Sequence, residues 1–187
     1  MWGIVGKCVL LPSLSIRKAM PMVRFLGNIE AKTDAKGRIF LPAVFRKQLQ
    51  AAGEERLVLR KDVFQDCLVL YPESVWFATQ ASLRGRLSKW NRQQQALFRQ
   101  FVSDAEVVVP DANGRILLSR RHLQAAGIGS EVRLIGVDDV IEIWAKERGE
   151  QPFYDPSAFG DALQEALAEG GQQQTDNDYG RSKTMDE

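Results

Sequence analysis

The sequence is poor in the residues that build metal and redox sites. It has two cysteines, Cys8 and Cys67, and one histidine, His122. The cysteines lie far apart, so neither a disulfide framework nor a metal-ligand spacing is present. Cys67 falls in an apolar stretch, where we expect a small core residue in a protein of a reducing cytosol. His122 is expected at the surface or at the edge of the core, and a histidine-based zinc site or catalytic dyad is not expected.

No apolar run is long enough to span a membrane. The apolar stretch over residues 8–16 is interrupted by Pro12 and falls well short of the ~20 residues that a spanning helix needs. It is also a poor signal peptide, because the start of the chain is nearly uncharged and the basic residues Arg17 and Lys18 follow the apolar stretch. Residues 1–21 are therefore interpreted as a disordered extension or a mis-assigned start, with translation beginning at Met22.

The sequence also lacks the usual signatures of an enzyme. It contains no Gly-rich phosphate loop and no plausible pair of nucleophile and base. We therefore expect no catalytic residue, no metal, no cofactor and no small-molecule substrate. A catalytic role stays as a third hypothesis, since small pseudo-symmetric β-barrels can carry catalytic sites.

What the sequence does contain is an internal repeat. Residues 33–42 read TDAKGRIFLP and residues 110–119 read PDANGRILLS. Each copy is followed by Leu-Gln-Ala-Ala-Gly, at residues 49–53 and 123–127. Two apolar, strand-like segments then close each copy. A whole supersecondary unit has been duplicated.

The pattern within each unit predicts a strand, a tight turn, a return strand, a helix and two further strands. In the first unit the turn spans Asp34 to Gly37, with a strand on either side of it, so we expect a β-hairpin. Pro42 opens the helix and Gly53 ends it. The expected strands are 25–31, 38–41, 56–61 and 67–71 in the first unit, and 104–109, 115–118, 131–135 and 140–144 in the second, whose helix is 119–126.

These segments predict an α+β fold that is mainly β. Two tandem β-hairpin/helix repeats should pair around a pseudo-two-fold axis and form one swapped-hairpin barrel with outer helices. The expected divisions are repeat 1 at 28–75, a helical linker at 76–103, repeat 2 at 104–147, and a tail at 150–187. We expect the tail to begin with a helix over 158–168 and then to become an acidic, disordered segment.

Charge is distributed unevenly. The net charge is +1, but residues 150–187 hold nine acidic and two basic residues. Residues 1–149 therefore hold 25 − 2 = 23 basic and 24 − 9 = 15 acidic residues, a net of +8. A basic body suggests a polyanionic partner, although a simple solubility balance is the alternative. The basic segment 79–103 is open to three interpretations: a solvated helix face, a surface that flanks DNA, or a subunit contact.

Within the repeated motif, most residues have structural roles. Asp34 and Asp111 start the turns, and Gly37 and Gly114 permit them. The two arginines that follow could simply pair with these aspartates, but an exposed pair contributes only about 0–1 kcal/mol. Alternatively, the pair orients a guanidinium toward phosphates or base edges. The predicted DNA-binding residues are Arg38, Lys36, Lys32 and Arg115, with the first copy stronger because Asn113 replaces Lys36.

The order of these motifs resembles the MraZ family over residues 22 to about 165. The resemblance includes both Asp-x-x-x-Arg motifs and the Leu-Tyr-Pro strand end at 70–72. It implies a bacterial transcriptional regulator of the division and cell-wall gene cluster, built from two SpoVT-AbrB swapped-hairpin domains. It further implies a closed ring of identical chains, located in the cytoplasm and on the nucleoid. The ring would bind short direct repeats in double-stranded promoter DNA, including its own promoter, with Arg38 and Arg115 as motif arginines.

An antitoxin is the alternative hypothesis. Related swapped-hairpin proteins often join a DNA-binding domain to a tail that neutralises a partner toxin, and the acidic, partly apolar segment 153–169 could serve. Such antitoxins usually carry one hairpin copy and dimerise, whereas this chain carries two.

Overall fold

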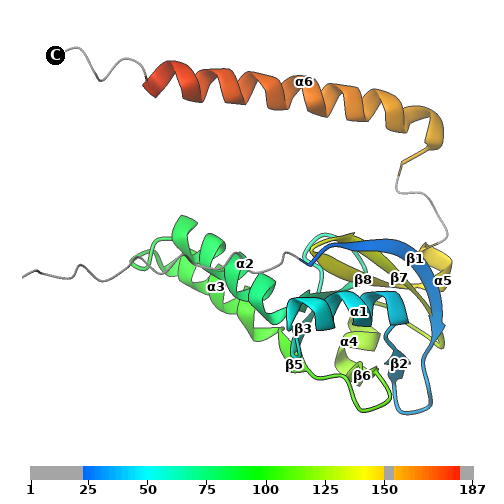
Figure 1. The fold of residues 1–187 in the computed structure, drawn as a ribbon. Helices are drawn as coiled ribbons and strands as arrows, with labels where there is room; N and C mark the ends of the chain where they lie inside the picture. The colour runs from blue at the N-terminus through cyan, green and yellow to red at the C-terminus, as the bar shows by residue number, and fades with distance from the viewer. Residues whose placement is uncertain (1–22, 150–153, 182–187) are drawn as a thin grey trace, which may run out of the picture.

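The computed structural model describes residues 23–149 and 154–181 of the chain. A sheeted body carries a pair of helices on one side, and a long helix stands apart from it (Figure 1). The elements in the described residues are β1 (Phe25–Lys32), β2 (Arg38–Phe40), α1 (Ala43–Ala52), β3 (Leu57–Lys61), β4 (Leu68–Pro72), α2 (Glu73–Arg86), α3 (Arg92–Ser103), β5 (Glu106–Val108), β6 (Arg115–Leu117), α4 (Arg120–Ala125), β7 (Glu131–Asp138), β8 (Val140–Ala145), α5 (Lys146–Gly149) and α6 (Pro156–Arg181).

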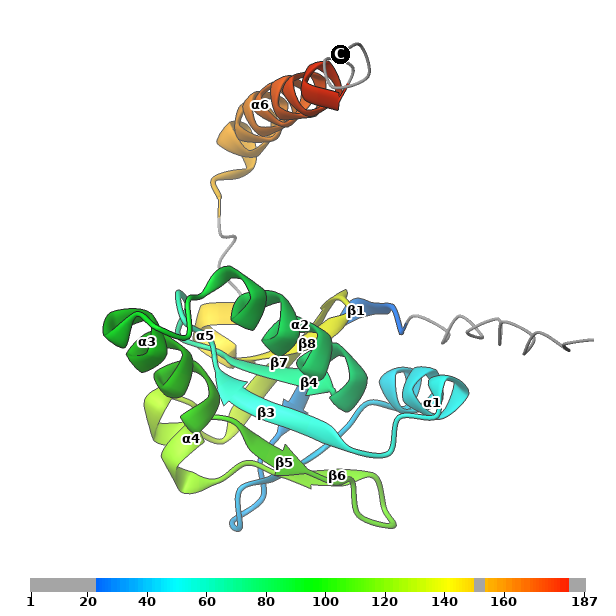
Figure 2. The same ribbon diagram turned by 90° about the vertical axis from the view of Figure 1, so that its left-hand side faces the viewer.

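Strands from the two repeats are interleaved in the same sheets, which interlocks the halves. The larger sheet has six antiparallel strands in the order β1-β7-β8-β4-β3-β5, and the smaller sheet pairs β2 with β6. Figure 2 shows these strands crossing beneath α2 and α3. The α+β, mainly β class with interlocked repeats is confirmed. The larger sheet is an open ladder with β1 and β5 at its ends, and the described strands do not close it into a barrel.

The prediction that the strands flanking each turn pair with each other is wrong. The turn itself forms, because the Asp34 N–H donates to the Arg38 carbonyl at 2.9 Å. Beyond it, however, β1 pairs with β7 and β2 pairs with β6. The backbone beside each turn bonds to the other repeat: the Leu41 N–H donates to the Gly114 carbonyl, and the Leu118 N–H donates to the Gly37 carbonyl, each at 2.9 Å. The strands beside each turn therefore satisfy their backbone groups with the other half of the chain.

The shared core lies between the sheets and α1. Ile39 and Ile116 face each other across β2 and β6 and are fully buried, as the alternation of each return strand predicts. Phe25 of β1 packs edge-on against Phe45 of α1, with ring centroids 5.6 Å apart. Cys67 is buried as predicted, and this burial raises the pKa of its thiol to about 12. Cys8 lies outside the described residues.

His122 does not lie at the surface, one of the two positions expected for it, because its side chain is completely buried. Its Nδ1 lies 2.9 Å from the Ser119 hydroxyl, and its Nε2 lies 3.0 Å from the Asp104 carbonyl oxygen. Both ring nitrogens thus have polar partners, which is the condition under which a polar side chain is tolerated in a core.

The basic linker forms the helical pair α2 and α3. Trp76 of α2 stacks on Phe101 of α3, with centroids 5.3 Å apart and an interplanar angle of 7°. The Asn91 side chain caps α3 by accepting the N–H groups of Gln93 and Gln94. The pair packs on the outer face of β3 and β4 and leaves its opposite face to solvent (Figure 2).

The C-terminal helix is longer than predicted. α6 extends to Arg181 rather than ending near residue 168. The predicted disorder of residues 182–187 and the interpretation of residues 1–21 fall outside the described residues. In the described part of the chain, no helix combines the length and apolar character needed to cross a bilayer.

Candidate nucleic-acid interface

The first turn is organised by the carboxylate of Asp34. Its Oδ1 accepts the backbone N–H groups of Lys36 and Arg38, at 2.8 and 2.9 Å. Its Oδ2 accepts Nε of Arg38 at 2.7 Å and lies 2.6 Å from Nη2. Gly37 adopts φ +79°, which an L-residue rarely takes and which allows the chain to reverse here.

The second turn repeats this geometry closely. Asp111 Oδ1 accepts the N–H groups of Asn113 and Arg115, at 2.9 and 3.0 Å. Its Oδ2 lies 2.8 Å from both Nε and Nη2 of Arg115. Gly114 has φ +78°. The pairing of aspartate and arginine across each turn, one of the two interpretations of the motif, is therefore present in both copies.

Each aspartate holds its arginine in one orientation. Both arginines are partly exposed, and Nη1 of Arg38 makes no hydrogen bond within the residues described. The backbone N–H and the guanidinium of Arg38 lower the pKa of Asp34 to about 2. The pKa of Asp111 is likewise lowered, chiefly by the N–H of Arg115. The arginines are thus pre-oriented, so an anion that binds them meets a small additional ordering cost.

The two arginines share the outer face of the β2–β6 ribbon. Arg38 lies opposite Leu117, and Phe40 lies opposite Arg115. Because Ile39 and Ile116 point into the core, these four side chains point outward. The Arg115 guanidinium carbon lies 5.7 Å from the centroid of the Phe40 ring, within range of a cation–π contact. The duplication therefore produces one surface with two equivalent arginines.

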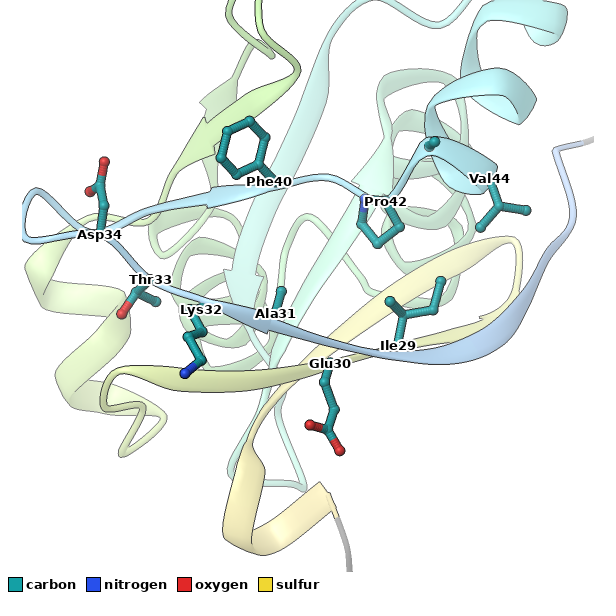
Figure 3. A pocket seen from close by; sticks show the side chains of 10 residues that line it. Ile29, Glu30, Ala31, Lys32, Thr33, Asp34, Phe40, Pro42 and Val44 are labelled. Atoms are coloured by element: carbon teal, nitrogen blue, oxygen red, sulfur yellow. The ribbon is translucent and has the colours of Figure 1, made fainter.

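The two lysines predicted for this interface lie in different places. Lys36 is exposed at the tip of the first turn. Lys32 lies on β1, and its Nζ is 3.0 Å from Glu131 Oε1 on β7. In Figure 3 its side chain points away from the side where Phe40 stands. Lys32 is thus engaged in an ion pair on the larger sheet, whereas Lys36 adds an exposed charge near Arg38.

A groove opens beside the ribbon where β1 and β2 diverge. It has a volume of about 640 Å³. Figure 3 shows Ile29 and Ala31 of β1 on the same side as Phe40, with Pro42 and Val44 at the start of α1. The local hairpin expected from the sequence would pair β1 with β2 and leave no space between these strands. The groove exists because β1 and β2 pair with other strands instead.

Other residues of this surface were not predicted from the sequence. Phe40 and Leu117 are 58% and 52% exposed between the arginines. In both Arg-Ile-Phe and Arg-Ile-Leu, the residue after the buried isoleucine must point to solvent because side chains alternate along a strand. This pattern could have predicted that Phe40 and Leu117 are exposed. Arg46 of α1 lies against the second turn. A Cβ added at Gly114 would lie only 2.6 Å from Nη1 of Arg46, which shows how closely the two pack. Its packing depends on the swapped arrangement, which no local pattern shows.

The turn carboxylates give a prediction about pH. Because the pKa of Asp34 is about 2 in the fold and its ordinary value is 3.8, its stabilising contacts are fully present above pH 3.8 and are lost as the pH falls through about 2. We expect carbon-detected NMR titration to show Asp34 ionising near pH 2, and Arg38→Ala to move this pKa upward. The control is Asp111 in the same variant, whose pKa should stay lowered. A pKa of Asp34 near 3.8 in the unmodified protein would contradict the geometry described.

The fold and these two turns define a class: an internally duplicated swapped-hairpin protein that presents two aspartate-held arginines on one ribbon. Comparison with known proteins gives the family. Residues 24–99 and 101–153 match the family model described as "MraZ protein, putative antitoxin-like". The chain belongs to the MraZ family.

Its relatives include proteins named transcriptional regulator MraZ. That of Bacteroides thetaiotaomicron is 63% identical over 152 residues, which cover 81% of this chain and 97% of the relative. That of Phocaeicola vulgatus is 60% identical over 145 residues, covering 78% and 94%. That of Shewanella oneidensis is 35% identical over 123 residues, covering 66% and 80%. The family match thus spans the interlocked body and both turns.

Proposed function

We propose that this protein is a sequence-specific DNA-binding transcriptional regulator without catalytic activity. The observation that carries the proposal is the β2–β6 ribbon, which presents two pre-oriented arginines on one face. The major groove of B-DNA is wide enough for a two-stranded β-ribbon, and arginine recognises guanine there through two hydrogen bonds. Lys36 and the net charge of +8 over residues 1–149 favour contact with the phosphates.

The proposed target is a set of short direct repeats in a promoter of the division and cell-wall gene cluster, including the protein's own. One chain offers a short ribbon and therefore few base contacts. A ring-shaped homo-oligomer on tandem repeats increases the effective concentration of each ribbon near its site. The names of the relatives support the regulatory role. The resemblance of the motifs to the MraZ family supports the ring and its place in the cytoplasm, on the nucleoid.

Footprinting on the DNA upstream of the protein's own gene, at several salt concentrations, tests the proposal. We expect protection of regularly spaced short repeats, with an affinity that falls steeply as salt rises, because phosphate contacts release bound cations. A shuffled fragment of the same composition is the control. Equal protection of both fragments, or none at low salt, would contradict sequence-specific binding.

A further inference from the structure

The fold leaves two large apolar side chains of the β2–β6 ribbon in solvent. Phe40 and Leu117 are each more than half exposed, while the isoleucine that precedes each of them fills the core. Single exposed apolar residues are common on protein surfaces. These two, however, share one short ribbon with both of the arginines that the turns hold. Apolar groups gathered on a binding surface indicate that a partner covers them.

The register of the ribbon places each of these side chains beside an arginine. Leu117 lies directly opposite Arg38, and Phe40 lies directly opposite Arg115. Side chains that face each other across antiparallel strands have Cβ atoms about 5 Å apart. Along β2, Phe40 stands two positions from Arg38, which is about 7 Å. The outer face therefore alternates charged and apolar groups at spacings of about one to two base-pair steps, each of roughly 3.4 Å.

The apolar groups also stand at the same side of the ribbon as the guanidinium groups. The Arg115 guanidinium carbon lies 5.7 Å from the centroid of the Phe40 ring. In Figure 3 the Phe40 ring and the carboxylate of Asp34, which holds Arg38, lie on the same side of the chain. A base pair that meets an arginine of this ribbon therefore has an apolar side chain close beside it.

The major groove of B-DNA offers one apolar group to such a side chain, the C5-methyl group of thymine. The other groups that the bases present there are hydrogen-bond donors and acceptors. An apolar side chain placed against a donor or acceptor removes its water without replacing the hydrogen bond, which costs free energy. Against a thymine methyl group, the same side chain buries apolar surface and gains free energy.

We infer that Phe40 and Leu117 are specificity-determining residues, each of which contacts the C5-methyl group of a thymine in the DNA target. The contacted thymine lies one or two base pairs from the guanine that the neighbouring arginine binds. This inference rests on the proposed function and adds a second kind of base contact to the same ribbon. The ribbon then reads guanine through its arginines and thymine through its apolar residues.

A DNA groove fits this face better than a second copy of the chain does. A protein surface that covered Phe40 and Leu117 would also cover both aspartate–arginine pairs, and desolvating such pairs can cost more free energy than their attraction returns. The major groove instead offers guanine acceptors to the arginines and methyl groups to the apolar residues. Lys36, which is exposed at the tip of the first turn, adds a positive charge that favours a polyanion.

Replacing thymine by deoxyuridine in the DNA tests the inference. Uracil lacks the C5-methyl group and keeps the hydrogen-bonding groups of thymine unchanged. Each thymine position of the footprinted repeat is replaced in turn, in all repeats of the fragment, and the affinity is measured by fluorescence anisotropy. At the contacted positions we expect a loss of about fourfold or more, which corresponds to the burial of one methyl-sized group. At the other positions the affinity should stay unchanged.

Variants of the ribbon connect each methyl group to its side chain. Phe40→Ala and Leu117→Ala should each show no further loss on deoxyuridine at the position that the missing side chain contacts, and the full loss at the other position. Phe77→Ala and Leu97→Ala are matched controls, because these side chains are similarly exposed but lie on α2 and α3. Both controls should keep the full loss at every contacted position.

The outcomes separate this inference from the proposed function. If deoxyuridine costs no affinity at any position, or if the protected repeat contains no thymine, the inference is wrong. It is also wrong if Phe40→Ala and Leu117→Ala keep their full sensitivity to deoxyuridine. If light scattering then shows that these variants have lost their assembly, the apolar face is a contact between copies. Failure of the proposed function looks different, because the unmodified protein would then protect no specific repeat even on thymine DNA, and the inference would fail with it.

Discussion

Arg38→Ala is expected to lower the affinity for the protected promoter fragment by about a hundredfold or more. A well-placed bidentate contact to a base is worth about 1–3 kcal/mol, or roughly fivefold to over a hundredfold for one ribbon. In an assembly that engages several repeats, every copy loses the same contact, so the losses combine. The free energy of unfolding should change by less than about 1 kcal/mol, because Arg38 contributes only an exposed ion pair to the fold.

Arg38→Lys is the matched control for this variant. Lysine keeps the charge but loses the planar fork that Asp34 holds and that a guanine would accept. We expect Arg38→Lys to retain the salt dependence of binding while losing most of the preference for promoter DNA over a shuffled fragment. Fluorescence anisotropy at several salt concentrations measures both quantities. An Arg38→Ala protein with unchanged affinity and salt slope would show that the ribbon is not the DNA-binding surface.

The equivalence of the two turns can be tested in the same assay. Arg115 has the same partners as Arg38, but Asn113 stands where the first turn has Lys36. If Lys36 contributes a phosphate contact, Arg115→Ala should lower the affinity less than Arg38→Ala does. The geometry of the arginines alone gives no such difference, so a larger loss in Arg38→Ala would indicate that the first turn is the stronger of the two DNA-binding turns.

The local parts of this structure could be predicted from the sequence because their causes are local. Asp34 and Gly37 form a turn with bonds to residues at most four positions away. Ile39 and Ile116 are buried because the strands that carry them alternate. The helices of the linker also follow from their own residues, since Asn91 caps α3 by itself.

The strand partners could not be predicted because the decisive contacts join distant residues. Nothing within residues 25–41 shows that β1 pairs with β7, about a hundred positions away. The burial of His122 depends likewise on Asp104, 18 positions away, and that of Arg60 on Phe101. The duplication indicated that two equal halves pair, but a local hairpin and a swapped one leave the same pattern in the sequence.

Because the halves hold each other through the turn glycines, Gly37→Ala should destabilise the fold by about 3 kcal/mol. A Cβ at Gly37 would lie 2.9 Å from the Leu118 carbonyl oxygen and 3.2 Å from Leu123 Cδ1. The first of these is backbone of the other repeat, and the Leu118 N–H donates to the Gly37 carbonyl at 2.9 Å. The substitution therefore combines a left-handed conformation, at about 1–2 kcal/mol, with a steric clash that separates the interlocked strands, at about 1–3 kcal/mol.

Gly53→Ala is the control that isolates the clash. Gly53 has a similar φ of +74°, but nothing lies within 4 Å of an added Cβ. It should therefore lose only about 1 kcal/mol, since alanine also restricts the unfolded chain. The loss of stability in Gly114→Ala should lie between the losses in Gly37→Ala and Gly53→Ala. The atoms that a Cβ at Gly114 would meet belong to the Arg46 side chain, which can move more easily than backbone. Urea unfolding of the three variants at one protein concentration measures the order. Equal losses at Gly37 and Gly53 would mean that the first turn is not held against the second repeat, and that the two halves are joined by the larger sheet alone.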